Sequence, residues 1–192
     1  MTNVEAAAAD NLRSLRDRPF ELLKELEKRS RPAGATGAPA DSAGSEWVGV
    51  AFRMGGETFL IAREETREVL GYPAAVTRVP GAKAWVKGLA NVRGQLLPMV
   101  DLRQFLGSGV TTAGRNTRVV VVNHRDIPAG LMVDEVLGFR RFAEREFNVE
   151  PPPTVIRCDS YLAGAFRRGG EIWPVLSLKS LVESQNFMQA AH

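Results

Sequence analysis

The chain has very few of the residues that carry metal and nucleophilic chemistry. Its 192 residues include one cysteine, Cys158, and two histidines, His124 and His192. A single cysteine excludes an internal disulfide and a multi-cysteine zinc site, and two histidines are too few for the ligand set of a zinc enzyme. We therefore expect no metal and no cofactor, and we interpret Cys158 as a small apolar side chain in a reducing compartment.

Catalytic motifs are missing as well. The sequence contains no Gly-x-Ser-x-Gly turn, no Walker loop and no His-Glu-x-x-His pair. Two acidic pairs, Glu64-Glu65 and Asp134-Glu135, consist of neighbours in the chain. On a strand, such neighbours point to opposite faces and cannot share a substrate. The sequence therefore predicts a protein that is not an enzyme.

Long apolar runs are absent too. No stretch approaches the roughly 20 apolar residues that a membrane-spanning helix needs. The first ten residues contain acids and no basic segment, unlike a secretory signal. We therefore expect a cytoplasmic protein.

The charge is balanced rather than strongly basic. The net charge is +3, and the two Arg-Arg pairs, Arg140-Arg141 and Arg167-Arg168, are separated in the chain. A barrel that binds nucleic acid through these arginines with Phe139, Phe142 and Trp173 is a distant alternative. We disfavour it because no basic stripe is continuous, and we expect no nucleic-acid partner.

What the sequence does contain is an internal repeat. Residues 88–106 return without a gap at residues 164–182, a shift of 76 (164 − 88). The identical pairs are Gly88 and Gly164, Gly94 and Gly170, Pro98 and Pro174, and Leu102 and Leu178. Upstream, residues 68–72 return at residues 135–139, a shift of 67 (135 − 68). Two echoes in the same order indicate duplication of one half-domain, with halves of roughly 46–115 and 116–188. The second copy carries about nine extra residues (76 − 67) around Pro151-Pro152-Pro153.

The organisation along the chain follows from turn residues and periodicity. Residues 1–45 form an extension with a short predicted helix, Pro19–Arg29, and a flexible Pro/Gly/Ala linker. From Trp47 onward, short strands flank glycine-rich or polar turns. The expected strand pairs are 47–54 with 58–62, 89–92 with 95–100, 118–123 with 129–133, and 163–167 with 171–176. Helices are expected at 101–106 and 178–188. This pattern predicts a mainly β fold of two small barrels with one brief helix in each half.

The segment Asn91-Val92-Arg93-Gly94 interrupts an apolar stretch with polar residues. It has two interpretations. In one, it is only a hairpin turn, in which Gly94 supplies the positive φ and Arg93 is solvated. In the other, Arg93 also anchors an interface, because arginine on a rigid hairpin beside apolar surface is a favoured binding residue.

The motifs resemble those of the CheW family, the coupling proteins of bacterial chemosensory arrays. The resemblance spans about Trp47 to Phe187. The segments that carry it are residues 52–59, 68–71, 86–94, 98–102 and 133–136. The Pro-Phe-Glu-Leu-Leu segment at residues 19–23 and the strand at residues 49–56 further resemble the PilI type, the branch of the type IV pilus (twitching motility) system.

The resemblance implies a fold of two intertwined five-stranded, SH3-like barrels and no enzymatic activity. It implies an adaptor that binds the cytoplasmic tip of a methyl-accepting chemoreceptor and the regulatory domain of a CheA-type histidine kinase, so that it reaches the membrane only through its partners in an array. Control of twitching motility is the expected output, and flagellar chemotaxis is the alternative.

The resemblance also implies site residues. The receptor groove maps to Thr66, Lys87, Gly88, Arg93, Val119 and Val120, and the kinase contact maps to Glu68 and Gly71. Thr66 departs from the aliphatic residue usual in the family. The loop at residues 144–159, with its triple proline, departs from flagellar couplers near a second kinase contact.

Overall fold

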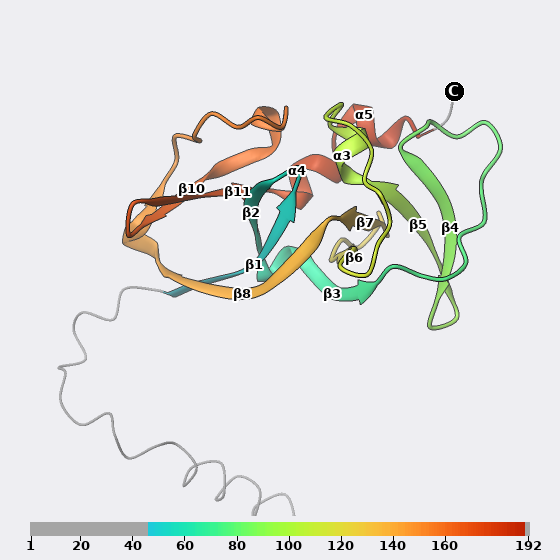
Figure 1. The fold of residues 1–192 in the computed structure, drawn as a ribbon, viewed down its shortest axis with the longest axis horizontal. Coiled ribbons are helices and arrows are strands. Elements are labelled where there is room, and N and C mark those ends of the chain that lie inside the picture. Colours follow the sequence, from blue (N-terminus) through green and yellow to red (C-terminus); the bar gives the residue numbers. More distant parts are fainter. Residues whose placement is uncertain (1–45, 191–192) are drawn as a thin grey trace, which may run out of the picture. The chain divides into compact units, whose positions relative to one another are not determined.

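The computed structural model describes residues 46–190. The helix expected at Pro19–Arg29 and its linker lie outside the described residues. The described chain forms two sheets (Figure 1). The six-stranded sheet has the order β8-β1-β2-β11-β10-β9, and its strands are Glu135–Ala143, Glu46–Met54, Glu57–Ala62, Glu171–Leu176, Leu162–Arg168 and Phe147–Asn148. The five-stranded sheet has the order β3-β6-β7-β5-β4, and its strands are Thr66–Gly71, Arg118–Val122, Gly130–Val133, Gln95–Asp101 and Val86–Val92. The prediction of a mainly β fold is confirmed. Two small five-stranded barrels were expected, and the structure has one sheet of six strands and one of five.

The two sheets repeat one topology. In the five-stranded sheet, β6 and β7 form a hairpin, and β5 pairs in parallel with β7. In the six-stranded sheet, β1 and β2 form the corresponding hairpin, and β11 pairs in parallel with β2. The outer strands β3 and β8 flank these hairpins at equivalent places. Each sheet therefore takes its central hairpin from one half of the sequence and its other strands from the other half. The sixth strand, β9, is only two residues long and pairs with β10 at Ala165 and Phe166.

Two glycines of the repeat have the same structural role. Gly88 and Gly164 both follow a register shift in their hairpins and have φ values of 139° and 147°. A side chain at either position would overlap a carbonyl oxygen of the neighbouring segment, that of Thr77 or that of Asn148. Both the backbone conformation and the close approach of the chain require glycine.

Short helices follow the last strand of each hairpin. Helix α3 (Leu102–Phe105) is capped by Asp101, which accepts a hydrogen bond from the backbone nitrogen of Gln104. Ser177 caps α4 (Leu178–Val182) in the same way. The single helix expected at 178–188 is divided, because the Ser184 side chain caps a separate helix, α5 (Gln185–Met188). Three 3-10 turns, Arg63–Glu65, Glu144–Glu146 and Asp159–Tyr161, connect other elements.

A shared core joins the two sheets. Its buried side chains come from β1, β2 and β11 of one sheet, from β5, β6 and β7 of the other, from the helices, and from the loop that carries Ile156 and Cys158. Each sheet also has a smaller apolar cluster on its opposite face. Strand β6 shows the alternation: Val119 and Val121 belong to the cluster of the five-stranded sheet, whereas Val120 and Val122 belong to the shared core. A strand buried on both faces explains the unbroken valine run.

An ion-pair network in the six-stranded sheet joins β10 to β8 and to the 3-10 turn that follows β8. The Nε of Arg168 donates to Glu146 Oε1 at 2.8 Å, its Nη1 donates to the carbonyl oxygen of Arg141 at 2.8 Å, and its guanidinium lies 4.4 Å from the centroid of the Phe142 ring. The backbone nitrogen of Ala143 also donates to Glu146. The hydrogen bond from Arg168, followed by that from Ala143, lowers the pKa of Glu146 to about 2.

This network predicts a loss of stability in acid. Because the folded-state pKa of Glu146 is depressed, its contribution is present above the ordinary pKa of about 4.5 and is lost as the pH falls towards 2. We expect Glu146→Gln to be less stable than the wild type at pH 7. Between pH 5 and pH 2.5, its melting temperature should fall by less than that of the wild type. Thermal melts of both proteins across this range measure the difference. Parallel pH profiles of the two proteins would contradict the assignment.

Candidate functional site

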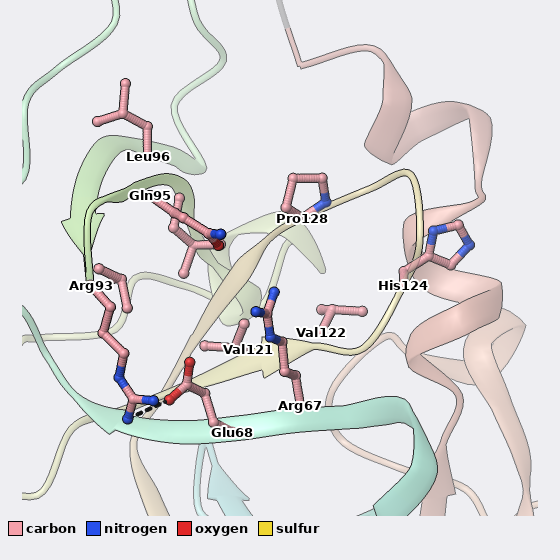
Figure 2. A pocket seen from close by; sticks show the side chains of 11 residues that line it. Arg67, Glu68, Arg93, Gln95, Leu96, Val121, Val122, His124 and Pro128 are labelled. Carbon is pink, nitrogen blue, oxygen red and sulfur yellow. Dashed lines mark ion pairs between the residues drawn. The ribbon is translucent and has the colours of Figure 1, made fainter.

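A pocket of about 280 Å³ lies beside the β4–β5 hairpin (Figure 2). Strand β3, the hairpin, the end of β6 and the loop that follows β6 form its walls. The lining residues are Arg67, Glu68, Val92, Arg93, Gln95, Leu96, Leu97, Val121, Val122, His124 and Pro128. We call it the hairpin pocket. It combines charged side chains with exposed apolar ones, since Leu96 is 68% exposed.

The turn of this hairpin is strained at Arg93. Val92 pairs with Gln95, so the loop has two residues, Arg93 and Gly94, with φ values of 51° and 83°. This is the type I′ pattern, which favours Asn-Gly or Gly-Gly. Arg93 is the one residue other than glycine with a positive φ in the described part of the chain. A positive φ was expected from the sequence only at Gly94, whereas both residues of the turn have one. A strained residue of this kind costs about 1–3 kcal/mol and points to a function.

Arg93 forms an ion pair with Glu68 of β3. The Nη2 of Arg93 lies 2.9 Å from Glu68 Oε2, and the two side chains are 77% and 22% exposed. An exposed pair of this kind contributes at most about 1 kcal/mol, so it orients the arginine more than it stabilises the fold. The contact brings together a residue predicted to bind the receptor and one predicted to bind the kinase.

A β-bulge places Arg67 in the same pocket as Glu68. Thr66 pairs with Val122 and Glu68 pairs with Val121, so Arg67 is an extra residue in β3. Adjacent residues of a regular strand point to opposite faces, but a bulge redirects a side chain. Figure 2 shows the Arg67 side chain rising from β3 into the middle of the hairpin pocket. Arg67 was not among the site residues predicted from the sequence, because nothing in the sequence marks the bulge.

Thr66 borders a neighbouring hollow of about 590 Å³. Residues of β3 and β8 line it, including Arg67, Glu68 and Phe139, and the ring of Phe139 is 62% exposed. The hydroxyl of Thr66 donates to the carbonyl oxygen of Ala62 at 3.4 Å. Arg67 and Glu68 line both hollows, so Thr66 lies next to the hairpin pocket.

Lys87 and Gly88 lie at the opposite end of β4 from Arg93, about 20 Å away along the strand. The Nζ of Lys87 is 3.2 Å from Asp101 Oδ2 and donates to Gln104 Oε1 at 2.7 Å. Asp101 is fully buried and also accepts a hydrogen bond from the backbone nitrogen of Thr111 at 3.0 Å. Gly88 is buried. Both residues therefore contact the interior of the protein at the start of β4, and neither lines the hairpin pocket.

The remaining predicted site residues divide by exposure. Val119 and Val120 are 1% and 0% exposed, so their side chains pack inside the protein and do not reach its surface. Gly71 ends β3, is exposed, and pairs with Arg118 of β6. No group of three or more metal-ligating side chains occurs in residues 46–190, and no helix in that range is long and apolar enough to cross a membrane.

Known proteins match most of the chain. The family model of the CheW-like domain matches residues 48–186. Protein PilI of Pseudomonas aeruginosa is 42% identical over 174 residues, which cover 90% of this chain and 96% of PilI. The chemotaxis protein CheW of Klebsiella aerogenes is 29% identical over 135 residues, or 70% of this chain and 80% of that protein. The crystal structure of the scaffolding protein TtCheW from Thermoanaerobacter tengcongensis has the same fold, with a TM-score of 0.65 at 23% identity, over 74% of this chain and 96% of that chain.

Proposed function

This chain belongs to the CheW-like domain family, and from that premise we propose that it is a non-enzymatic adaptor that couples methyl-accepting chemoreceptors to a CheA-type histidine kinase. Membership of a family of scaffold proteins and the likeness to PilI and to chemotaxis proteins CheW support the proposal. Its place would be the cytoplasm, in arrays attached to the membrane through the receptors.

The single observation that carries the proposal is the strained Arg93 and its ion pair with Glu68. An arginine with a left-handed backbone conformation at a hairpin tip is strained, and such strain is typical of residues with a function. The second copy of the hairpin shows the unstrained solution: Gly169 stands where the first copy has Arg93, with φ 60°. Arg93 thus serves a purpose that the turn alone does not need.

Coupling by contact needs a stiff body between two interfaces. The shared core packs side chains of both sheets against one another, so a displacement at one surface is resisted by the other sheet. The proposed partners bind through small surfaces, and many such contacts in an array reinforce one another.

The residues that are exposed or partly exposed are the best candidates for direct contact. We assign Thr66 and Arg93 to the receptor surface, and Glu68 and Gly71 to the kinase surface. Lys87, Gly88, Val119 and Val120 would support the receptor surface from beneath, because the first holds Asp101 and the others are buried.

The output we propose is control of type IV pilus twitching motility. The similarity to PilI, which extends over 96% of that protein, favours it. Flagellar chemotaxis remains the alternative, since chemotaxis proteins CheW also match most of the chain. Deletion of the gene should abolish twitching and leave swimming unchanged; the reverse phenotype would support the alternative.

Arg93→Gly tests the site with opposite expected effects on folding and binding. Because glycine accepts φ 51° without strain, the melting temperature should stay unchanged or rise. Binding to a purified receptor tip should weaken about tenfold, because the variant loses a charged interface anchor. Calorimetry and thermal melts measure the two effects, and Arg115→Gly, at an exposed loop arginine, is the control. Unchanged receptor binding would remove Arg93 from the receptor surface.

A further inference from the structure

The hairpin pocket contains a positive charge that the described part of the protein leaves uncompensated. Of its four titratable residues, Arg93 and Glu68 pair with each other, and His124 lies 3.1 Å from Glu183 outside the pocket. Figure 2 shows one ion pair within the pocket, between Arg93 and Glu68, and none at Arg67. No hydrogen bond or ion pair joins the Arg67 side chain to any other residue among 46–190. Its guanidinium is therefore available to an anion from outside.

From this geometry we infer that the hairpin pocket binds an acidic side chain of the histidine kinase regulatory domain, with Arg67 as the residue that selects it. The inference rests on the proposed function and deepens it. An aspartate or glutamate of the partner would enter between the Arg93–Glu68 pair and the loop that carries His124, and would meet the planar, multi-donor head of Arg67.

The bulge is the structural device that makes this possible. Without it, Arg67 and Glu68 would alternate, and only one of them would face the pocket. With it, the carboxylate paired with Arg93 lies beside the Arg67 guanidinium, which has no partner within the described part of the chain. Glu68 was assigned to the kinase contact, and its neighbour shares that surface.

The second copy of the repeat lacks this charged bulge residue, so the feature is particular to the first copy. The echo that aligns Glu68 with Glu135 aligns Arg67 with Asp134. The carboxylate of Asp134 accepts a hydrogen bond from the backbone nitrogen of Gly55 at 2.7 Å, so it is used within the fold. The bulge of β8 lies instead at Leu137, between the pairs Ala51 with Gly138 and Phe52 with Val136. The duplicated fold therefore does not itself require a charged bulge residue.

The rim of the pocket favours a protein over a free anion. Leu96 is 68% exposed, and Pro128 beside it is exposed as well. A protein segment would cover this apolar surface while its carboxylate reached Arg67, whereas a small anion would leave the surface in water. Apolar contact around a central charge pair is also the arrangement that gives such pairs their largest effect.

The test is a binding titration of the purified kinase regulatory domain against the full-length chain and its variants. We expect Arg67→Glu to weaken binding at least about tenfold, because a like charge replaces the attraction. Arg67→Lys should retain part of the affinity, since lysine keeps the positive charge but lacks the planar guanidinium that can donate two hydrogen bonds to one carboxylate. Added salt should weaken wild-type binding more steeply than Arg67→Glu binding. The matched control is Arg78→Glu, the same charge reversal at an exposed arginine of the β3–β4 loop, and it should bind within twofold of the wild type.

The outcomes separate the inference from the proposed function. Wild-type binding combined with unchanged binding by Arg67→Glu, or with an equal loss in Arg78→Glu, would overturn the inference alone. A loss of receptor binding with unchanged kinase binding would overturn the kinase as the occupant. Absence of any wild-type binding to the kinase domain would contradict the proposed function itself. Recovery of Arg67→Glu binding by an acid-to-lysine change in the kinase domain would identify the partner carboxylate. Thermal melts of Arg67→Glu and Arg67→Ala confirm that the exposed position leaves the fold intact.

Discussion

Replacing Asp101 with alanine is expected to lower the free energy of unfolding by about 3 kcal/mol. The carboxylate is fully buried, caps α3, accepts a hydrogen bond from the backbone of Thr111 and lies 3.2 Å from the Nζ of Lys87. Its removal leaves the first turn of the helix and a loop amide without their acceptor, and it leaves the half-buried Lys87 ammonium without its counter-charge. Urea denaturation of wild type and variant measures the loss.

The same experiment decides what Lys87 does. If Lys87 supports the fold through Asp101, then Lys87→Met should destabilise it too, because a buried carboxylate loses its counter-charge. The double variant Lys87→Met/Asp101→Ala should be less destabilised than the sum of the single variants. Lys179→Met, at an exposed lysine of α4, is the control and should change stability by no more than about 0.5 kcal/mol. Additive losses would show that Lys87 stabilises the fold independently of Asp101. A Lys87→Met protein of full stability that fails to bind receptor would argue that Lys87 contacts the receptor directly.

Gly88→Ala should be the most damaging glycine-to-alanine change in the first copy of the repeat. The new Cβ would overlap the carbonyl oxygen of Thr77, and alanine at φ 139° is strained even without that contact. We expect a loss of about 3 kcal/mol or more in free energy of unfolding, visible as a lower urea midpoint or as insoluble protein.

Two other glycines serve as controls for this change. Gly164→Ala should behave alike, because Gly164 occupies the same position in the second copy. Gly114→Ala should be nearly neutral, since nothing lies within 4 Å of its added Cβ and its φ is not in the left-handed region. Full stability of Gly88→Ala would contradict the close approach of the two segments and would leave a direct receptor role for Gly88.

The hairpins could be predicted from the sequence because their turns are marked locally. Glycines such as Gly55-Gly56 and Gly169-Gly170 indicate where the chain reverses, and apolar residues flank them. Strands β3 and β8 were recognised as echoes but not as strands. Neither forms a hairpin with its sequence neighbour, and both pair with strands far away in the chain, β6 and β1. Their assignment depends on tertiary pairing, which the local pattern does not contain.

The candidate site was predictable in part for the same reason. Arg93 was a candidate because a polar tip interrupts an apolar stretch, whereas Glu68 was a candidate only through the resemblance to the CheW family. Arg67 could not be found, since a bulge appears only when the register of β3 against β6 is known. Val119 and Val120 were assigned to a surface, but a valine run does not reveal that both faces of its strand are covered.

The exchange of central hairpins between the halves has a consequence for how this protein can vary. A fragment that stops near residue 115 would keep β3, β4 and β5 but lose β6 and β7, which lie between β3 and β5. It would also present β1 and β2 with no neighbours on either side. Neither half of the duplicated sequence can therefore complete a sheet by itself, and each depends on the other to fold.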